Sequence, residues 1–309
     1  MTPRTWKSEK CFGTALILMA CATTSHAQQN VRTPPFEEMY KMPCVYSVPG
    51  MDKVQARRDI VYKTVQGPDG KIDLKLDLYT PSGAKTTDRF PVVILISGGG
   101  AGDHDFRDAG VYLSYGRILG ASGYVAITFA KRFGRDGDPL QGLTDFNDLV
   151  AYIRGHAAQF HVNPGRMAFW AFSAGGSLLS PVLSDMRPYA RAALCFYCVT
   201  DRDFSSLSAD DAQKLRERLS PLVQIEGAEY AVPPIFVARA GLDGPGINEP
   251  LGRFVTEAVT KNLSIEMMNH PDGHHGFDLL DADARSREII QRALEFIKAR
   301  LTGTEQGHT

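Results

Sequence analysis

Short, continuous apolar runs alternate along this chain with longer stretches that repeat apolar residues at helical spacing. An apolar run without polar alternation is typical of a strand buried on both faces of a parallel sheet. Strands that alternate with helices predict β-α-β units, with helices packed on both faces of one sheet. The strands predicted in this way cover residues 91–96, 124–130, 167–171, 192–198, 235–240 and 264–268. The helices predicted with them cover residues 110–119, 143–160, 174–186, 249–261 and 283–301.

The region before residue 91 has a different pattern. Residues 59–66 and 71–79 alternate polar with apolar side chains, and the turn-forming sequence Gly67-Pro68-Asp69-Gly70 lies between them. This pattern predicts an antiparallel hairpin at the edge of the sheet. The predicted fold class is therefore α/β: a mostly parallel, doubly wound sheet with helices on both faces and an antiparallel N-terminal hairpin.

We expect one domain over residues 58–302, because neither an internal repeat nor a low-complexity linker divides this region. Residues 28–57 contain prolines and lack periodicity, which predicts an irregular segment, and residues 303–309 are expected to form a disordered tail. Residues 206–218 are polar and interrupt the alternation of strands and helices. They predict either a solvated surface helix or an insertion that overhangs a site at the strand ends.

Residues 1–27 have the pattern of a signal peptide. Three basic residues within the first ten precede an apolar stretch at 12–19 that is too short to span a bilayer, and Ser25-His26-Ala27 fits a cleavage site. As an alternative, Leu18-Met19-Ala20-Cys21 resembles a bacterial lipobox, which would place a lipid on Cys21. We favour soluble export, to the periplasm or beyond, over a lipoprotein. No later stretch is long and apolar enough to predict an integral membrane segment.

The composition excludes a basic surface for nucleic acid. The formal net charge is -1, and acidic and basic residues are interspersed, so electrostatic attraction to a polyanion is not expected. Hydrophobic residues make up 43% of the 309 residues, enough to bury a sizeable core. Nothing in these patterns indicates an oligomeric state.

Three cysteines follow the signal region: Cys44, Cys195 and Cys198. Export would permit a disulfide bond. Cys195 and Cys198 are expected to point to opposite faces of one strand, roughly 10 Å apart, which is too far for a bond. A bond from Cys44 to either of them and three buried free thiols both remain open. No cysteine or histidine pair has metal-ligand spacing, so we expect neither a metal site nor an organic cofactor.

Ser173 follows the predicted strand at 167–171 and precedes the predicted helix at 174–186, in the sequence A-F-S-A-G-G. Small residues on both sides of a turn serine allow a sharp bend that exposes Oγ. This arrangement is the nucleophile elbow of hydrolytic enzymes, usually written G-x-S-x-G, with Ala171 here in place of the first glycine. The alternative is an ordinary turn between a strand and a helix.

A glycine-rich loop, Ser97-Gly98-Gly99-Gly100-Ala101-Gly102, follows the predicted strand at 91–96. Consecutive glycines let backbone N–H groups converge on one point, as the oxyanion of a tetrahedral intermediate requires. Gly98, Gly99 and Gly100, together with the N–H of Ala174, are therefore the predicted oxyanion-hole donors. A flexible loop is the alternative. A phosphate-binding loop is disfavoured, because no Lys-Ser/Thr pair follows.

Asp243 lies just past the predicted strand at 235–240, where a carboxylate can orient an imidazole. An aspartate before glycine is also common in plain turns. Asp201, after the preceding strand, is the reserve candidate for the same role.

His275 lies in the sequence G-H-H-G-F-D, on a loop between the last predicted strand and the last predicted helix. We favour His275 over His274 as the catalytic base, because His-Gly-Phe is the pattern expected around a catalytic histidine. In open α/β sheets, ligands bind beyond the carboxyl ends of the strands, and all four of these features fall at such ends. The order Ser, Asp, His along the chain differs from the orders in chymotrypsin and subtilisin.

The chain resembles the α/β-hydrolases, most closely their exported esterase and dienelactone-hydrolase-like branches. The resemblance covers roughly residues 60–301 and rests on S-G-G-G-A-G, A-F-S-A-G-G, A-R-A-G-L-D and G-H-H-G-F-D. It implies an eight-stranded, mostly parallel sheet and a triad of Ser173, Asp243 and His275. Two positions depart from the family pattern. Residue 97 is serine where the lipase-type loop usually has histidine, and Ala171 stands where the elbow usually has its first glycine. Dienelactone hydrolases proper use cysteine as the nucleophile, so Ser173 argues against that exact reaction.

The resemblance and the residue pattern together predict a serine hydrolase that cleaves carboxylic esters through an acyl-enzyme. The absence of a separate lid region favours short-acyl or carbohydrate-linked esters as the small-molecule substrate. One alternative is a serine peptidase of the prolyl-oligopeptidase type, which the lack of a propeller-length N-terminal region disfavours. The other is a non-catalytic binding protein on the same fold, which would be expected to lack a member of the triad.

Overall fold

The computed structural model describes residues 34–67, 70–99, 105–132, 139–184, 187–202, 204–229 and 231–302. All the elements named below belong to the unit Pro35–Thr309. The signal peptide predicted at 1–27, the lipidation alternative at Cys21, the tail predicted at 303–309 and the candidate oxyanion donor Gly100 lie outside the described residues.

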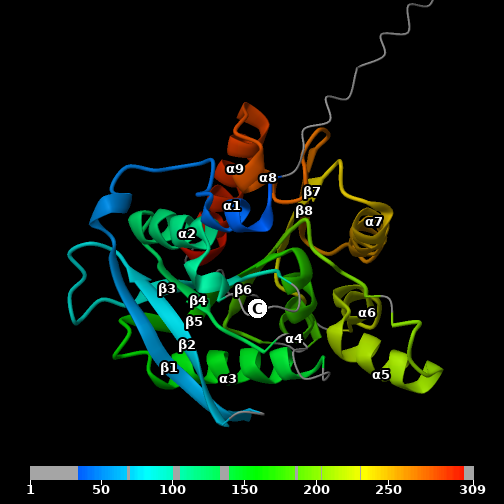
Figure 1. Cartoon of the computed structure of the whole chain (residues 1–309), viewed down its shortest axis with the longest axis horizontal. Helices are drawn as coiled ribbons and strands as arrows, with labels where there is room; N and C mark the ends of the chain where they lie inside the picture. Colours follow the sequence, from blue (N-terminus) through cyan, green and yellow to red (C-terminus); the bar gives the residue numbers. More distant parts are fainter. Residues whose placement is uncertain are drawn as a thin grey trace, which may run out of the picture. The chain divides into compact units, whose positions relative to one another are not determined.

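Eight strands of the described chain form one sheet, in the order β1-β2-β4-β3-β5-β6-β7-β8 (Figure 1). Strands β3 to β8 pair in parallel, whereas β2 pairs with β1 and β4 in antiparallel orientation. The strands are β1 Gln55–Gly67, β2 Gly70–Thr80, β3 Phe90–Ile96, β4 Val125–Phe129, β5 Val162–Phe172, β6 Ala190–Phe196, β7 Ile235–Ala240 and β8 Ile265–His270. The predicted fold class, a mostly parallel eight-stranded sheet with an antiparallel hairpin, is confirmed.

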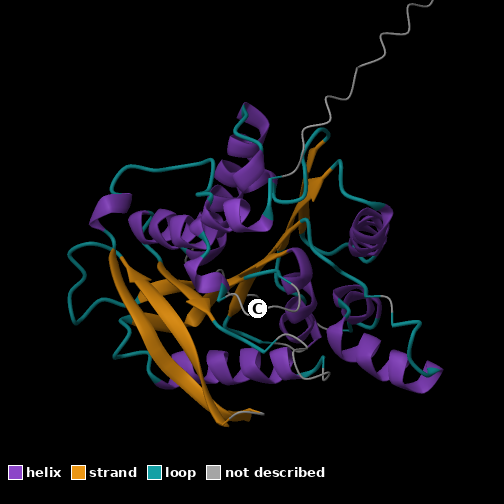
Figure 2. Cartoon of the chain, viewed as in Figure 1, coloured by secondary structure: helices purple, strands orange, loops and turns teal. Residues whose placement is uncertain are grey.

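Helices cover both faces of this sheet (Figure 2). The helices whose apolar residues join the first core cluster are α3 Gln141–Gly155, α4 Ser180–Ser184, α5 Ala209–Leu219, α6 Pro221–Glu226 and α7 Pro245–Thr260. Those that join the second cluster are α2 Gly110–Ala121, α8 Phe277–Leu280 and α9 Ala284–Leu301. The remaining described helical segments are α1 Phe36–Lys41 and the 3-10 turns η1 Met51–Lys53, η2 Phe106–Asp108 and η3 Ser173–Leu179.

The apolar run of β3 explains why helices are needed on both faces. Val92 and Ile94 belong to the first core cluster, and Val93 and Leu95 belong to the second. Successive strand residues point to opposite faces, so an unbroken apolar run must be covered on both sides. The connection order reverses between β4 and β5, which both pair with β3. Ligands in open α/β sheets bind at such a switch point, beyond the carboxyl ends of the strands.

The local structure differs from the sequence expectation in three places. The helix predicted at 174–186 is the 3-10 turn η3 followed by the short α4, because Gly175 and Gly176 open it and glycine is a weak helix former. The helix predicted at 143–160 ends at Gly155. The segment expected to be irregular contains α1, and β1 already begins at Gln55. The polar insertion contains α5, capped by the Ser208 side chain.

All three cysteines in the described residues are buried free thiols. Cys44 lies in the second core cluster and Cys195 and Cys198 lie in the first, on the other face of the sheet. The expectation that Cys195 and Cys198 point to opposite faces is therefore wrong. Strand β6 ends at Phe196, and Tyr197 has a left-handed φ of 41°, which turns Cys198 back to the face of Cys195. Burial raises the pKa of the Cys44 thiol to about 12, as expected of an unreactive thiol.

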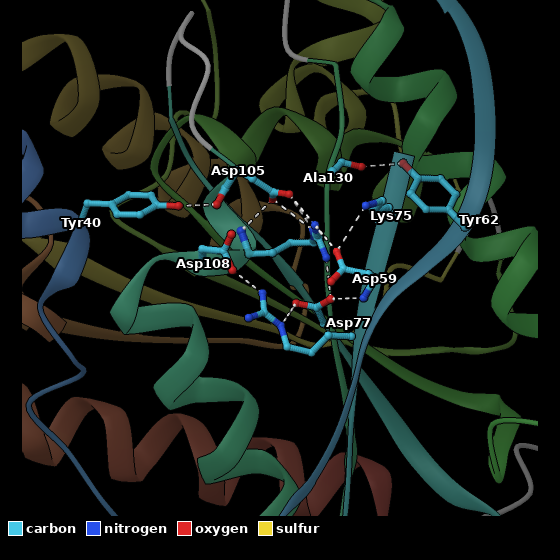
Figure 3. Close-up of polar contacts among 10 residues, drawn as sticks. Tyr40, Asp59, Tyr62, Lys75, Asp77, Asp105, Asp108 and Ala130 are labelled. Carbon is cyan, nitrogen blue, oxygen red and sulfur yellow. Dashed lines mark hydrogen bonds and ion pairs between the residues drawn. The ribbon is translucent and has the colours of Figure 1, made fainter. Parts of the chain in front are cut away.

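A cluster of charged residues joins the edge hairpin to the turn η2 (Figure 3). The Arg107 guanidinium is buried, and its Nη1 donates to Asp77 Oδ1 over 2.5 Å. Its Nε and Nη2 donate to the Asp105 carboxylate over 2.9 and 2.5 Å, and Nη2 also reaches Asp59 over 3.2 Å. Asp77 is fully buried on β2 and also accepts from Arg58 Nε over 3.0 Å. These contacts fix the chain directly after the glycine-rich loop to the sheet.

We expect Asp77→Ala to lower the free energy of unfolding by about 3 kcal/mol, because it leaves the buried Arg107 without one of its partners. Urea unfolding followed by circular dichroism measures the change. The matched control is Asp73→Ala on the same strand, where Asp73 accepts an exposed hydrogen bond from Thr64. The control is expected to change the free energy by less than about 0.5 kcal/mol. Equal effects of the two substitutions would contradict this account.

Candidate active site

Ser173 lies at the sharp turn between β5 and η3, with a left-handed φ of 53°. This conformation is costly for a residue with a side chain and persists only where surrounding contacts enforce it. Gly175 supplies one such contact, because a Cβ there would lie 2.5 Å from the Ile96 carbonyl oxygen. Gly98 supplies another, because its Cβ would lie 2.7 Å from Ser173 Cβ. Both glycines allow the end of β3 to lie directly against the elbow. Ala171, which replaces the usual first glycine, is fully buried in the first core cluster.

Three predicted residues form one hydrogen-bonded chain. His275 Nε2 lies 2.8 Å from Ser173 Oγ, and His275 Nδ1 lies 2.8 and 3.0 Å from the two carboxylate oxygens of Asp243. An imidazole that donates from Nδ1 to a carboxylate leaves Nε2 free to accept the serine proton. The Asp243 side chain is 5% exposed and that of His275 is 40% exposed. The carboxylate is thus shielded, while the imidazole can reach a substrate.

Backbone contacts bring the loops of Asp243 and His275 together. The N–H groups of Gly241 and Leu242 donate to the carbonyl oxygens of His270 and Gly273 over 2.8 and 3.0 Å. A Cβ at residue 241 would lie 2.0 Å from the Pro271 carbonyl oxygen, so only glycine allows this approach. The Asn248 side chain, on α7, donates to the Asp243 carbonyl oxygen over 2.9 Å.

The structure places the two reserve candidates elsewhere. His274 Nδ1 and its backbone N–H both contact the Asp281 carboxylate, over 2.8 Å each, which turns the ring away from the Ser173 chain. Asp201 accepts two hydrogen bonds from Arg216, over 2.9 and 2.7 Å. Burial alone would raise the pKa of Asp201, but the hydrogen bonds, chiefly from Arg216, lower it. Asp201 is therefore an ion-pair partner of Arg216, whereas the carboxylate that contacts His275 Nδ1 is that of Asp243.

The glycine-rich loop lies against the elbow, as far as the described residues extend. The Gly98 N–H donates to the Tyr112 hydroxyl oxygen over 3.1 Å. Gly99 has a φ of 104°, which favours glycine, and lies against the Phe106 ring. The N–H of Gly98 is thus already used within the protein, and Gly99 is the other predicted loop donor that the structure describes.

Lys131 supports the base of this loop and was not anticipated from the sequence. It follows β4, and its Nζ donates to the Ser97 carbonyl oxygen over 2.9 Å and to Ser97 Oγ over 2.8 Å. Serine at position 97, where lipase-type loops usually have histidine, therefore provides two acceptors for an ammonium group. Burial lowers the pKa of Lys131 to about 8.

A buried carboxylate lies behind His275 and was also missed from the sequence. Asp278 is fully buried and accepts hydrogen bonds from the hydroxyls of Tyr197 and Tyr115 over 2.6 and 2.9 Å. Burial raises the pKa of Asp278, although the two hydroxyls act in the opposite direction. The Tyr197 ring packs edge-on against the His275 ring, with centroids 4.8 Å apart. The Asp278 carbonyl oxygen accepts from the Val45 N–H over 2.9 Å, which ties the N-terminal segment to this region.

No group of three or more His, Cys, Asp or Glu side chains among the described residues could hold a metal ion. Among the same residues, no helix has the length and apolarity that crossing a membrane requires.

The comparisons with known proteins agree with this architecture. The BD-FAE family model matches residues 76–185, a range that includes the glycine-rich loop and Ser173. The native Est2 esterase of the Planctomycetes species Thermogutta terrifontis superposes with a TM-score of 0.65 and 22% identity, covering 84% of this chain and 97% of that one. Its butyrate-bound form gives a TM-score of 0.64, 22% identity, and coverages of 84% and 98%. Because the sequence identity is only 22%, this structural similarity shows that the two proteins share a fold.

A local match of a different kind involves a curated protein. Tetraacyldisaccharide 4'-kinase of Leptothrix cholodnii is 36% identical over 92 residues. The match spans 28% of this chain and only 26% of the kinase. It therefore carries no argument about the whole chain.

We expect Gly175→Ala to lower the free energy of unfolding by about 1–3 kcal/mol, because the new Cβ would lie too close to the carbonyl oxygens of Ile96 and Ser97. The matched control is Gly252→Ala within α7, where a Cβ would meet no atom within 4 Å. The control is expected to stabilise the protein by up to about 1 kcal/mol, since alanine is the better helix former. Urea unfolding measures both variants, and changes of the same sign would contradict the close approach at the elbow.

Proposed function

Because the chain has the α/β-hydrolase fold, we propose that it is a serine hydrolase that cleaves carboxylic esters. The observation that carries the proposal is the hydrogen-bonded chain from Ser173 through His275 to Asp243. Nucleophile, base and orienting carboxylate have the mutual geometry that acyl transfer requires.

In the acylation step, Ser173 Oγ attacks the ester carbonyl carbon while its proton passes to His275 Nε2. The resulting tetrahedral intermediate collapses, the bond to the alcohol oxygen breaks, and the imidazolium gives its proton to the departing alcohol. Water then attacks the acyl-enzyme by the same route and releases the carboxylic acid. Asp243 holds the tautomer that leaves Nε2 unprotonated and stabilises the imidazolium.

We assign oxyanion stabilisation to the N–H of Ala174 and to the glycine-rich loop. Within that loop, we favour the Gly99 N–H over the Gly98 N–H as the donor to the oxyanion, because the Gly98 N–H already donates to the Tyr112 hydroxyl. Gly98 serves instead to let the loop approach Ser173 closely. Gly100, which lies outside the described residues, remains a predicted donor. Loss of one such donor costs about 10²–10³ in rate in serine hydrolases.

Short acyl groups are the proposed acyl part of the substrate. The related Est2 structures include butyrate-bound and propionate-bound forms, and one form phosphonylated by sarin. The identity to these proteins is 22–23%, so the substrate class comes to this chain as a proposal. We also propose carbohydrate-linked esters as substrates and export from the cytoplasm as the location of the protein.

The proposal is tested with the Ser173→Ala and His275→Ala variants on p-nitrophenyl acetate. Each is expected to lower kcat by about 10⁴-fold or more, because the nucleophile or its base is lost. A fluorophosphonate probe should label the parent protein at Ser173 and leave Ser173→Ala unlabelled. His274→Ala is the matched control and should retain most of the activity, since His274 contacts Asp281 instead. Unchanged turnover in Ser173→Ala would refute the assignment.

Lys131 gives this enzyme an expected dependence on alkaline pH. Its pKa is lowered to about 8 by burial, so the positive charge beneath the oxyanion loop disappears as the pH rises through this value. Lys131→Met is expected to lower kcat roughly tenfold at pH 7, less than the loss of a direct donor. The parent rate should fall above pH 8, and the variant should lack that fall. A variant that keeps the alkaline decline of the parent would assign the decline to another group.

A further inference from the structure

The loop that carries His275 wraps around one side chain, that of Tyr197. The His275 ring packs edge-on against the Tyr197 ring, with centroids 4.8 Å apart and an interplanar angle of 61°. The Phe277 ring also packs against the Tyr197 ring, at 5.5 Å and 82°. Asp278 Oδ1 accepts a hydrogen bond from the Tyr197 hydroxyl over 2.6 Å. Gly276 supplies the turn between these contacts, with a left-handed φ of 81°.

Tyr197 itself has a strained backbone. It follows the last residue of β6, and its φ of 41° lies in the left-handed region, which is an outlier for a bulky side chain. Such a conformation costs free energy and persists only where the surrounding contacts impose it. Here the Tyr197 N–H donates to the Ala238 carbonyl oxygen over 2.7 Å, and the side chain is buried. Strained residues of this kind cluster at functional sites, and the group that Tyr197 contacts there is the imidazole of His275.

Asp278 anchors the Tyr197 hydroxyl. Its side chain is fully buried, and its second carboxylate oxygen accepts a hydrogen bond from the Tyr115 hydroxyl, on α2, over 2.9 Å. In the described part of the chain, these two hydroxyls are the side-chain partners of the carboxylate. Burial raises the pKa of both phenols well above the ordinary value, so both hydroxyls remain donors. A buried carboxylate is costly unless it is hydrogen-bonded, so the bond to Tyr197 is one that the fold preserves.

The imidazole needs this support because its own hydrogen bonds leave it free to tilt. His275 Nδ1 bonds to Asp243 and Nε2 bonds to Ser173, which fixes the ring at two points. Torsion about the bond to an imidazole ring is broad, so the ring can still tilt about the line through those points. The His275 side chain is 40% exposed, so water borders much of it. Small errors in orientation matter, because displacing a reacting group by about 1 Å can lower a rate by about 10².

We propose that Tyr197 is a positioning residue for His275 and that Asp278 holds Tyr197 in place. The Tyr197 ring limits the tilt of the imidazole, and the hydroxyl bond to Asp278 keeps the ring where it can do so. The proposal rests on the proposed esterase function and adds two residues that act through its base. Because Asp278 also bonds to Tyr115, the orientation of the imidazole is coupled to the position of α2.

The test is Tyr197→Phe, which removes the hydroxyl and keeps the ring. With p-nitrophenyl acetate as the substrate, kcat should fall about tenfold and KM should stay within about twofold, because the orientation of the base is lost and substrate contacts are not. Titration with a fluorophosphonate gives the concentration of active sites, so unfolded protein does not enter kcat. An unchanged kcat per titrated site would overturn the inference. Turnover by the parent protein tests the proposed function separately.

Two other tyrosine variants separate positioning from stability. Tyr115→Phe removes the second hydroxyl from Asp278, so it should destabilise the protein in urea about as much as Tyr197→Phe does. The Tyr115 ring packs against β5 rather than against His275, so kcat should fall only about twofold. The control is Tyr189→Phe at the other end of β6, where the hydroxyl also makes a hydrogen bond, and it should leave kcat unchanged. An equal fall in kcat in Tyr115→Phe and Tyr197→Phe would overturn the inference, because the loss would then follow stability.

If the parent protein turns over no ester, the imidazole itself still decides the inference. The proton that His275 Nδ1 donates to Asp243 gives a separate downfield proton NMR signal, which His275→Gln identifies by removing it. In Tyr197→Phe this proton should exchange faster with water, because the ring leaves its hydrogen bond more often, and in Tyr189→Phe its exchange should match the parent. Equal exchange in Tyr197→Phe and the parent would contradict the positioning role. Absence of the signal from the parent would contradict it as well, since an imidazole held in one orientation gives that signal.

Discussion

The close approach of three backbone segments at the carboxyl ends of β3, β5 and β6 is the constraint on which the rest of the structure depends. Gly98 lies against Ser173, Gly175 lies against the last carbonyls of β3, and Gly176 lies against the Val199 carbonyl oxygen. No side chain fits at these points. The left-handed conformation of Ser173 is therefore enforced by its neighbours, and the strain is offset by the packing of the parallel strands beneath it. The same backbone contacts fix Ser173, the proposed nucleophile, where its Oγ lies 2.8 Å from His275 Nε2.

Charged groups with little exposure stabilise the loops around that elbow from separate directions. Arg107 fixes the chain that follows the glycine-rich loop, Lys131 binds Ser97 at its start, and Asp278 lies behind the His275 ring. Each has at least two polar partners, as groups removed from water require. The hydrogen-bond partners of each group come from different elements, so the position of one loop depends on the positions of the others. The candidate site is consequently assembled by the whole sheet, although Ser173, Asp243 and His275 belong to three short loops.

The fold was largely predictable, because parallel strands buried on both faces leave unbroken apolar runs in the sequence. The candidate site was predictable where a motif has local backbone demands, as at Ser173, or follows a strand end, as at Asp243 and His275. The supporting residues were not. Lys131 and Tyr197 carry no pattern in their neighbourhood, and their roles arise from contacts over 34 and 81 residues of sequence. The faces of Cys195 and Cys198 were mistaken because the strand ends between them, a boundary that alternation alone does not reveal.

The segment before the hairpin has a consequence for where the folding unit begins. The Tyr40 hydroxyl donates a hydrogen bond to the Asp105 carbonyl oxygen, and the Val45 N–H donates one to the Asp278 carbonyl oxygen. The carbonyl oxygens of Lys41 and Met42 lie so close to residue 110 that only glycine fits there. These residues form a segment that contacts α2 and the chain that follows His275. A shortened protein that starts at residue 58, where the periodic pattern starts, would retain every parallel strand and the side chains of Ser173, Asp243 and His275. It would nevertheless expose the surface of α2 that contacts Lys41 and Met42, and it would remove the hydrogen bond from Val45 to Asp278. The folding unit therefore begins before residue 58, where the recognisable sequence pattern begins.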